Sequence, residues 1–200
     1  MKKTKMNLSV VLLSGIFALC ASTETETAAK TVADQKLRNQ LSNGDFSTFK
    51  NRGTAPGWTF WKGKDSRGKV QFEKTAGVDQ SPAAVLSGGN IVLFSFAEIQ
   101  GGETIYVRLK TKKNGGGDAG VSVRFQTAGR KWLPLTVNKP VVFSASGGWT
   151  VAELAAKAPA DAKIAVPMFS IKNIESPESR VVLDDVELYI IQVPEKSLDK

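Results

Sequence analysis

The chain has 200 residues, of which 42% are hydrophobic and 23% charged. This balance allows one domain of ordinary size with a real core. The sequence contains no histidine and a single cysteine, Cys20. These counts exclude histidine-based catalytic triads, histidine-ligated metal centres and an intramolecular disulfide.

The first 21 residues have the pattern of an export signal. Three lysines within the first five residues precede the apolar stretch Leu8–Leu19, and the small residues Cys20–Ser22 follow it. We therefore expect residues 1–21 to form a bacterial-type signal peptide that is cleaved near Cys20–Ser22. The protein is then exported to the periplasm, the cell surface or the medium. The apolar stretch is too short for a good transmembrane segment, so none is expected.

A lipid anchor at Cys20 is the alternative fate of this signal. The segment Phe17–Cys20 resembles a bacterial lipobox, but Leu19 stands where a small residue is usual. Ordinary cleavage is therefore favoured over lipidation.

The basic charge of the chain lies partly in the signal. Its removal takes away three lysines and no acidic residue, which lowers the net charge from +8 to +5. No nucleic-acid partner is therefore expected.

The segments that flank the central part of the chain are polar. Residues 22–38 are small and polar, with Thr and Glu alternating from Thr23 to Thr27, and they predict a flexible tether with a helical turn as an option around Val32–Leu37. Residues 194–200 form a polar tail. The folded domain is expected over residues 39–193.

Short strands separated by Gly, Pro and Asn turns account for this domain. We expect strands near residues 43–49, 57–62, 69–74, 83–87, 91–98, 103–112, 120–127, 131–136, 140–144, 149–156, 163–171 and 181–191. The segment Val151–Ala158 also has the Ala and Glu content of a helix. A strand is favoured there because Trp149–Val151 precedes the segment and Pro159 ends it.

Two of these strands alternate cleanly between apolar and polar residues. Ile105, Val107 and Leu109 share one face of the first strand, and the second strand has a similar apolar face, made of Val121, Val123 and Phe125. The glycine-rich turn Gly115–Asp118 between the two strands predicts a hairpin. Half-polar strands spaced about ten residues apart are typical of an all-β, two-sheet antiparallel sandwich, and we expect a jelly roll.

The closing strand, Val181–Ile191, carries a carboxylate within an apolar face. Strict alternation places Asp184 on the core face, together with Val182, Val186, Leu188 and Ile190. A buried ionised aspartate is unfavourable unless it is paired, hydrogen-bonded or bound to a metal. Asp184 therefore needs a partner, which is either an early loop around Asn43–Asp45 or a structural Ca²⁺.

Three segments, in their order and spacing, also carry a family resemblance. Leu41–Phe46 followed by Ala55–Trp58 forms an opening motif, Gly148–Val151 a later Gly-Trp strand, and Leu183–Leu188 a closing strand. Together they resemble carbohydrate-binding modules of families 4, 9 and 22, which are galactose-binding-like jelly rolls. The motifs span residues 41–191, almost the whole domain.

The resemblance implies a structural calcium ion between the first strands and the closing aspartate. The matching positions here are Gly44, Asp45 and Asp184. The residue after Phe46 is Ser47, where the family usually has an acidic residue, so one ligand or its charge is missing.

Candidate sugar-binding residues are the exposed aromatic and planar polar side chains. Trp58 and Phe60 share one strand face and are assigned to the core, whereas Trp61 lies on the opposite face. Trp132 follows the basic turn Gly129–Lys131. The polar faces of the two alternating strands add four further candidates, Tyr106, Arg108, Arg124 and Gln126. The planar fork of arginine suits carboxylate and sulfate, which makes a polysaccharide with anionic groups one expectation.

An enzyme is not expected. The sequence has no nucleophile motif, phosphate-binding loop or metal cluster. Asp184 and Asp185 point to opposite faces of a regular strand and cannot form the carboxylate pair of a glycosidase. We predict an exported, non-catalytic carbohydrate-binding module. The alternative is a cell-surface or periplasmic scaffold or interaction protein that uses the same sandwich without binding sugar.

Overall fold

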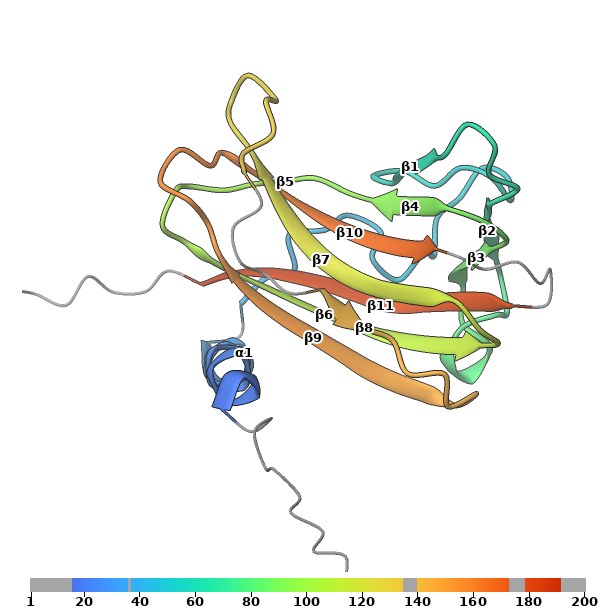
Figure 1. Ribbon diagram of the computed structural model, residues 1–200, viewed down its shortest axis with the longest axis horizontal. Coiled ribbons are helices and arrows are strands. Elements are labelled where there is room, and N and C mark those ends of the chain that lie inside the picture. Colours follow the sequence, from blue (N-terminus) through green and yellow to red (C-terminus); the bar gives the residue numbers. More distant parts are fainter. Residues whose placement is uncertain (1–15, 36, 135–139, 173–178, 192–200) are drawn as a thin grey trace, which may run out of the picture.

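Two antiparallel sheets packed face to face form the body of the protein (Figure 1). The structure, a computed structural model, describes residues 16–35, 37–134, 140–172 and 179–191. In chain order the elements are α1 (Ile16–Gln35), β1 (Thr59–Lys62), β2 (Lys69–Glu73), the 3-10 turn η1 (Val78–Gln80), β3 (Ala83–Ser87), β4 (Ile91–Phe94), β5 (Ala97–Glu98), β6 (Thr104–Asn114), β7 (Asp118–Gln126), β8 (Val141–Val142), β9 (Trp149–Lys157), β10 (Ile164–Lys172) and β11 (Arg180–Ile191).

The strands divide into a first sheet, in the order β1-β4-β10-β7-β8, and a second sheet, in the order β2-β3-β11-β6-β9. The short strand β5 pairs with β10 in the first sheet. Every pairing is antiparallel. The predicted two-sheet antiparallel sandwich is confirmed.

Most predicted strands are present with nearly the predicted bounds, and the segment with a helical alternative is strand β9. The predicted strand at 43–49 is absent. Asn43 and Phe46 adopt left-handed conformations, with φ of 57° and 52°. The Asn43 side chain also holds the turn, because its Oδ1 accepts a hydrogen bond from Thr48 N at 2.8 Å and its Nδ2 donates to Thr48 O at 2.8 Å. The predicted strand at 131–136 is represented by one bridge, between Gln126 and Trp132, and its last residues lie outside the described part.

The predicted hairpin between β6 and β7 is wrong, because the two strands lie in different sheets. β6 pairs with β11 and β9, whereas β7 pairs with β10 and β8. The turn Gly115–Gly117 therefore carries the chain from one sheet to the other. Both strands bury one face in the shared core, and this gives the same alternation as neighbours in one sheet. Their polar faces consequently point to opposite sides of the molecule.

The core between the sheets contains the predicted apolar faces of β6 and β7 and an aromatic cluster. The ring centroid of Trp58 lies 4.9 Å from that of Phe46 and 5.9 Å from that of Phe169. The Trp58 indole Nε1 donates to Asn43 O at 2.9 Å. The opening motif thus folds as a loop that is fixed by a buried tryptophan.

A β-bulge interrupts the closing strand β11. Its register against β6 shifts between Asp184 and Glu187, and Asp185 has φ of 47°. Before the bulge Val181 and Leu183 face the core, and after it the even-numbered residues do, beginning with Val186. The predicted alternation is therefore wrong for the first half of the strand, since an extra residue reverses the faces.

Asp184 is buried, as predicted, with 1% of its surface exposed. It lies on the outer side of the second sheet, where the loop before β3 covers it. Its Oδ2 accepts hydrogen bonds from Val78 N at 2.8 Å and Ser81 Oγ at 2.6 Å, and its Oδ1 accepts from Asp185 N at 2.7 Å. The partner is thus the η1 loop and not the predicted Asn43–Asp45 loop.

The Asn43–Asp45 loop instead contacts β11 at the bulge. Val186 N donates to Gly44 O at 2.9 Å, and a Cβ at Gly44 would collide with Val186 O. The Asp45 carboxylate accepts from Ser47 N at 3.2 Å and Ser47 Oγ at 3.0 Å.

The predicted calcium ligands have separate partners: Asp184 accepts its hydrogen bonds from the η1 loop, whereas Gly44 O accepts from Val186 N and Asp45 Oδ1 accepts from Ser47. A structural Ca²⁺ at these residues stays a prediction. Among the residues that the structure describes, no group of three or more acidic, Cys or His side chains is placed to hold a metal ion.

Helix α1 replaces much of the predicted flexible tether at 22–38 and contacts β6, β9 and β11 of the second sheet (Figure 1). Ala28 is buried, and Ala29 and Val32 pack beside it against Tyr106 and Ile191. From Thr23 onward the helix is mostly polar and these three apolar residues form a narrow stripe on it, which is why composition alone suggests a tether. No helix in the described part is long and apolar enough to span a membrane. Cleavage of a signal near Cys20–Ser22 stays a prediction.

Replacing Asp184 by Asn should lower the free energy of unfolding by about 1–3 kcal/mol, because an amide cannot accept all three hydrogen bonds and one donor stays unpaired. Urea denaturation measures this loss. Asp185→Asn is the matched control: it removes an exposed ion pair with Lys110, asparagine tolerates a positive φ, and the effect should be small. Equal losses in both variants, or a melting temperature that falls on chelation of Ca²⁺, would contradict this role for Asp184.

Candidate functional site

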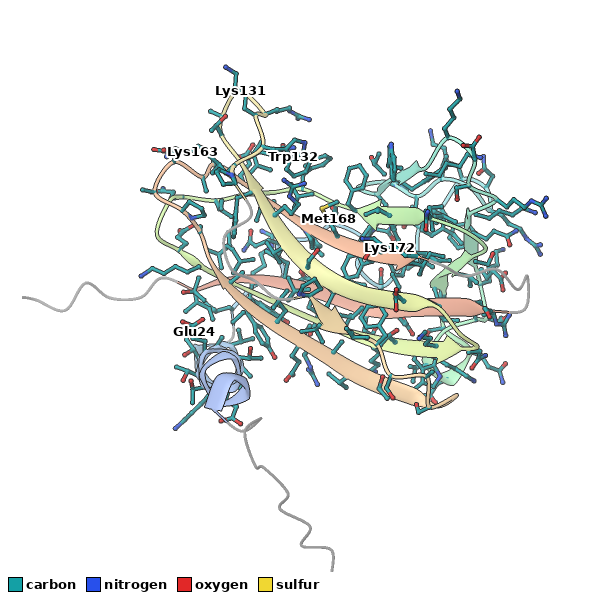
Figure 2. All side chains as sticks on the ribbon, viewed as in Figure 1. Glu24, Lys131, Trp132, Lys163, Met168 and Lys172 are labelled. Carbon is teal, nitrogen blue, oxygen red and sulfur yellow. The ribbon has the colours of Figure 1, made fainter. Side chains whose placement is uncertain are left out.

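The outer face of the first sheet carries several large apolar side chains that are exposed and are not part of the core. Trp61 is 59% exposed, Trp132 46% and Phe96 38%. Phe94 and Met168, which pair across β4 and β10, lie between them and are partly exposed. Figure 2 shows Trp132 and Met168 on this side of the molecule, away from α1. We call this surface the aromatic face and define it by Trp61, Phe94, Phe96, Arg124, Trp132 and Met168.

Strand β1 places Trp61 at one edge of the aromatic face. Trp58 points into the core, so Trp61, three residues later, points outward. The backbone neighbours of Trp61 across the sheet are Val92, then Ser170 and then Gly120. Gly120 is required because a Cβ would lie 2.5 Å from Val141 O. The row beside Trp61 is therefore made of small side chains.

Trp132 lies at the other end of the aromatic face and is held by Arg124. The Arg124 Cζ atom lies 4.5 Å from the Trp132 ring centroid, a cation–π contact. Arg124 Nε and the Oε1 atom of the buried Gln126 have no hydrogen-bond partner within the described chain. Within the described chain, the contact that orders the Arg124 guanidinium is therefore its stacking on Trp132.

A basic turn borders the same end. Its backbone is closed by hydrogen bonds from Arg130 N to Thr127 O at 2.9 Å and from Thr127 N to Lys131 O at 3.0 Å. The Arg130 Cζ lies 5.5 Å from the Phe96 ring centroid, and Phe96 meets Phe94 edge to face at 5.6 Å. Sequence reasoning missed both phenylalanines. The burial of Ile91 and Leu93 puts Phe94 outside by alternation, and that signal was available.

Trp61 and Trp132 lie far apart along the strands. Trp61 is in register with Gly120 of β7, and Trp132 bridges to Gln126, six residues further along the same strand. At about 3.3 Å per residue this separation is about 20 Å. One small molecule cannot contact both rings, whereas an extended chain can.

Three of the six predicted ligand-binding residues, Trp61, Arg124 and Trp132, lie on the aromatic face. Gln126 belongs to the same strand as Arg124, but its side chain is buried. The other two, Tyr106 and Arg108, belong to β6 and lie on the outer face of the second sheet. They were grouped with Arg124 and Gln126 because of the predicted hairpin. Phe60, assigned to the core, is 42% exposed at the edge of the sandwich.

Tyr106 is not available to a ligand, because only 1% of its surface is exposed and α1 packs against it. Its hydroxyl donates to Glu153 Oε1 at 2.7 Å. Arg108 Nε lies 3.4 Å from Glu153 Oε1, and Arg108 also pairs with Glu187. Burial raises the pKa of Tyr106 far above its ordinary value, and the hydrogen bond to Glu153 raises it further.

Comparison with solved structures identifies the architecture. The xylan-binding domain CBM22-1 of Xyn10C from Paenibacillus barcinonensis matches with a TM-score of 0.57 and 13% identity, over 78% of this chain and 97% of that domain. A family 4 carbohydrate-binding module matches with a TM-score of 0.56 and 17% identity, over 76% of this chain and 99% of that one. The fold is that of carbohydrate-binding modules of families 4 and 22. At these identities the carbohydrate-binding-module fold alone is shared.

The same fold also occurs inside larger proteins. The enzymatically active domain of tailspike protein 4 from bacteriophage CBA120 matches with a TM-score of 0.57 and 16% identity, over 76% of this chain. The match spans only 21% of that protein's length. No protein-family model matches the sequence. No curated protein matches it either.

Trp61→Ala and Trp132→Ala should each leave the melting temperature nearly unchanged, because both rings are exposed. Trp58→Ala should cost about 3–5 kcal/mol, since it empties a buried site between Phe46 and Phe169. Thermal unfolding followed by circular dichroism separates the three variants. Unfolding of the Trp61 or Trp132 variant would contradict their placement on the aromatic face.

The raised pKa of Tyr106 predicts a loss of stability at alkaline pH. The folded state keeps this phenol protonated, so its contribution is full below pH 10.0, the ordinary value, and is lost as the pH rises above it. The free energy of unfolding, measured between about pH 8 and about pH 11, should fall less steeply for Tyr106→Phe than for the natural protein. Tyr189→Phe is the comparison: burial also raises the pKa of Tyr189, the only other tyrosine, so this variant should flatten the slope too and the two variants separate the two contributions. Identical slopes for the natural protein and Tyr106→Phe would contradict the effect.

Proposed function

We propose that the protein is an exported, non-catalytic module that binds an extended polysaccharide along the aromatic face. The observation that carries this proposal is the placement of Trp61 and Trp132, exposed at the two ends of one sheet face. Large exposed rings that share a face mark interaction surfaces. Flat rings also suit the apolar C–H faces of pyranose sugars, which they contact by stacking.

The spacing of the rings supports a polymer as the ligand. Because about 20 Å separates them along the strands, only a chain of several sugar units reaches both. Gly120, Ser122 and Ser170 lie on the sheet between the two rings, and their small side chains do not project far from its surface. The xylan-binding domain described above, which has the same fold, supports a polysaccharide ligand for this chain too.

Arginines beside the rings support a ligand with anionic groups. Arg124 is stacked on Trp132 and Arg130 on Phe96, so each guanidinium is already ordered next to a proposed sugar contact. Ordering a long side chain costs entropy on binding, and a side chain that is already stacked loses less. A planar guanidinium can donate two parallel hydrogen bonds to the oxygens of a carboxylate or sulfate.

The positions of the acidic groups support a binding module over a glycosidase. In the described strands of the first sheet the carboxylates are Glu98 and Asp118. Glu98 is in register with Ile164, and Asp118 with Lys172 at the other end of β10. Eight residues at about 3.3 Å each put them about 26 Å apart, whereas a glycosidase pair needs about 5–9.5 Å.

Affinity electrophoresis and calorimetry against xylan and polygalacturonate test this function. Trp61→Ala and Trp132→Ala should each weaken binding about tenfold or more, because each removes one stacked contact of about 1–3 kcal/mol. If the ligand is anionic, binding to polygalacturonate should also weaken with added salt and with Arg124→Gln.

Val151→Ala is the matched control, because Val151 is 51% exposed but lies on the second sheet. It should bind as the natural protein does. Absence of binding to a broad panel of neutral and acidic polysaccharides would contradict the proposal and favour the alternative of a protein-contact surface. Binding that survives both tryptophan substitutions would place the site elsewhere.

A further inference from the structure

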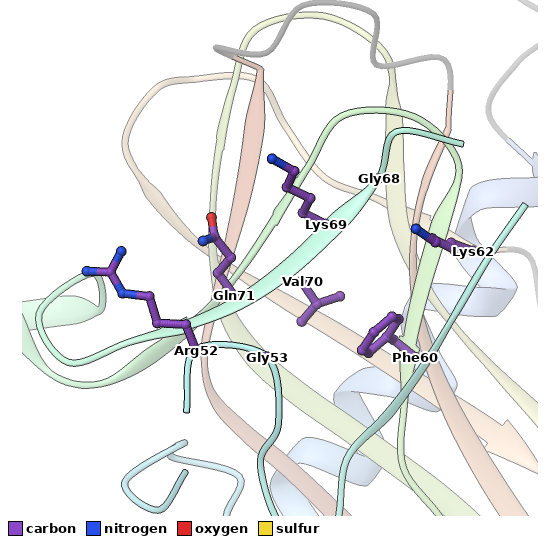
Figure 3. Close-up of a pocket in the computed structure, with 8 residues that line it drawn as sticks. All are labelled: Arg52, Gly53, Phe60, Lys62, Gly68, Lys69, Val70 and Gln71. Carbon is purple, nitrogen blue, oxygen red and sulfur yellow. The ribbon is translucent and has the colours of Figure 1, made fainter. Parts of the chain in front are cut away.

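A concave site that is separate from the aromatic face lies at the side of the sandwich, where the edge strands of the two sheets face each other. The pocket opens between β1 and β2 and has a volume of about 310 Å³. Figure 3 shows its lining, which comes from these strands and from the loop that precedes β1. The aromatic face uses none of these residues.

The floor of this edge pocket is apolar and its shape depends on glycine. Phe60 and Val70 approach each other across the gap between the strands (Figure 3). Phe60 is 42% exposed, so one side of its ring is open to a ligand. A Cβ at Gly68 would lie 2.7 Å from Gly88 O, so this part of the wall is bare backbone. The result is a half-exposed ring beside an open space.

The rim is basic. Arg52, Lys62 and Lys69 line the pocket, and none of the lining residues is acidic. In the described part of the chain the ion pairs involve Arg108 and Lys110, and no carboxylate lies within 4 Å of the charged atoms of these three cations. Three like charges around one concave site create a positive potential that attracts an anion.

A backbone N–H on the free edge of β2 adds a hydrogen-bond donor to the edge pocket. Phe72 N donates to Arg52 O at 2.8 Å, which shows that the backbone of Phe72 points away from β3. Backbone groups alternate along an antiparallel strand, so the N–H of Val70 points to the same free edge, into the pocket. The Gln71 amide on the rim supplies a further group suited to a hydroxyl.

We propose that the edge pocket binds an acidic sugar residue: its carboxylate or sulfate lies among Arg52, Lys62 and Lys69, and its ring rests on Phe60. The volume is at the lower bound for small-ligand sites and is larger than a bare oxyanion needs. A neutral sugar would leave the three charges unpaired. The site is separate from the aromatic face, and its existence does not depend on the proposed function.

Nuclear magnetic resonance titration of the full chain tests the site directly. The ligands are trigalacturonate, which carries carboxylates, an oligosaccharide of a sulfated galactan, and neutral galactotriose as the control. At least one anionic ligand should shift the backbone amides of residues 68–71, and galactotriose should not. The anionic ligand that produces the shift identifies the acidic group.

Single substitutions test which cations of the edge pocket bind the anionic group of the ligand. Arg52→Gln and Lys69→Gln should each weaken binding of that ligand about tenfold, as expected for the loss of one charge-assisted hydrogen bond. Lys157→Gln, an equal loss of charge on the exposed end of β9, should have little effect. Trp132→Ala should leave these amide shifts unchanged, so failure of the aromatic face and failure of the edge pocket are distinguishable. No shift at residues 68–71 with either anionic ligand, or an equal loss in Lys157→Gln, would overturn the proposal.

Discussion

The bulge in the closing strand is the constraint on which the rest of the sandwich depends. β11 lies in the middle of the second sheet, between β3 and β6. A change in which of its side chains point to the core therefore affects its packing with both neighbouring strands. The extra residue turns the Asp184 carboxylate outward to the η1 loop and lets Val186 receive the Gly44 loop. One irregularity thereby ties two loops to one strand. The loop that holds Trp58, and with it the start of β1, is one of the two.

The sequence predicts the class of fold and most strand positions, because alternation and turn residues are local signals. It does not predict which strands are neighbours. Val107 and Val121 have the same pattern whether their strands pair in one sheet or face each other across the core, so the hairpin prediction failed. The bulge was missed for a related reason: a positive φ at Asp185 depends on contacts from loops distant in sequence.

The candidate site was predicted in part for the same physical reason. Trp61 follows from alternation after a buried Trp58, which needs no knowledge of topology. Tyr106 and Arg108 were assigned to the site through the wrong pairing, and only the sheet order places them on the other side. The edge pocket could not be predicted at all, because Phe60 and Lys69 are brought together by the approach of two separate sheets.

Helix α1 makes the two outer faces of the sandwich different from each other. It packs on part of the outer face of the second sheet, around Tyr106 and Ile191, and the aromatic face lies on the opposite side of the sandwich. The part of α1 that contacts the sheet, from Ala28 to Val32, lies beyond the predicted cleavage near Cys20–Ser22. The first turns of the predicted mature chain would therefore lie on the side of the sandwich opposite to the aromatic face, where they leave a bound polysaccharide unobstructed.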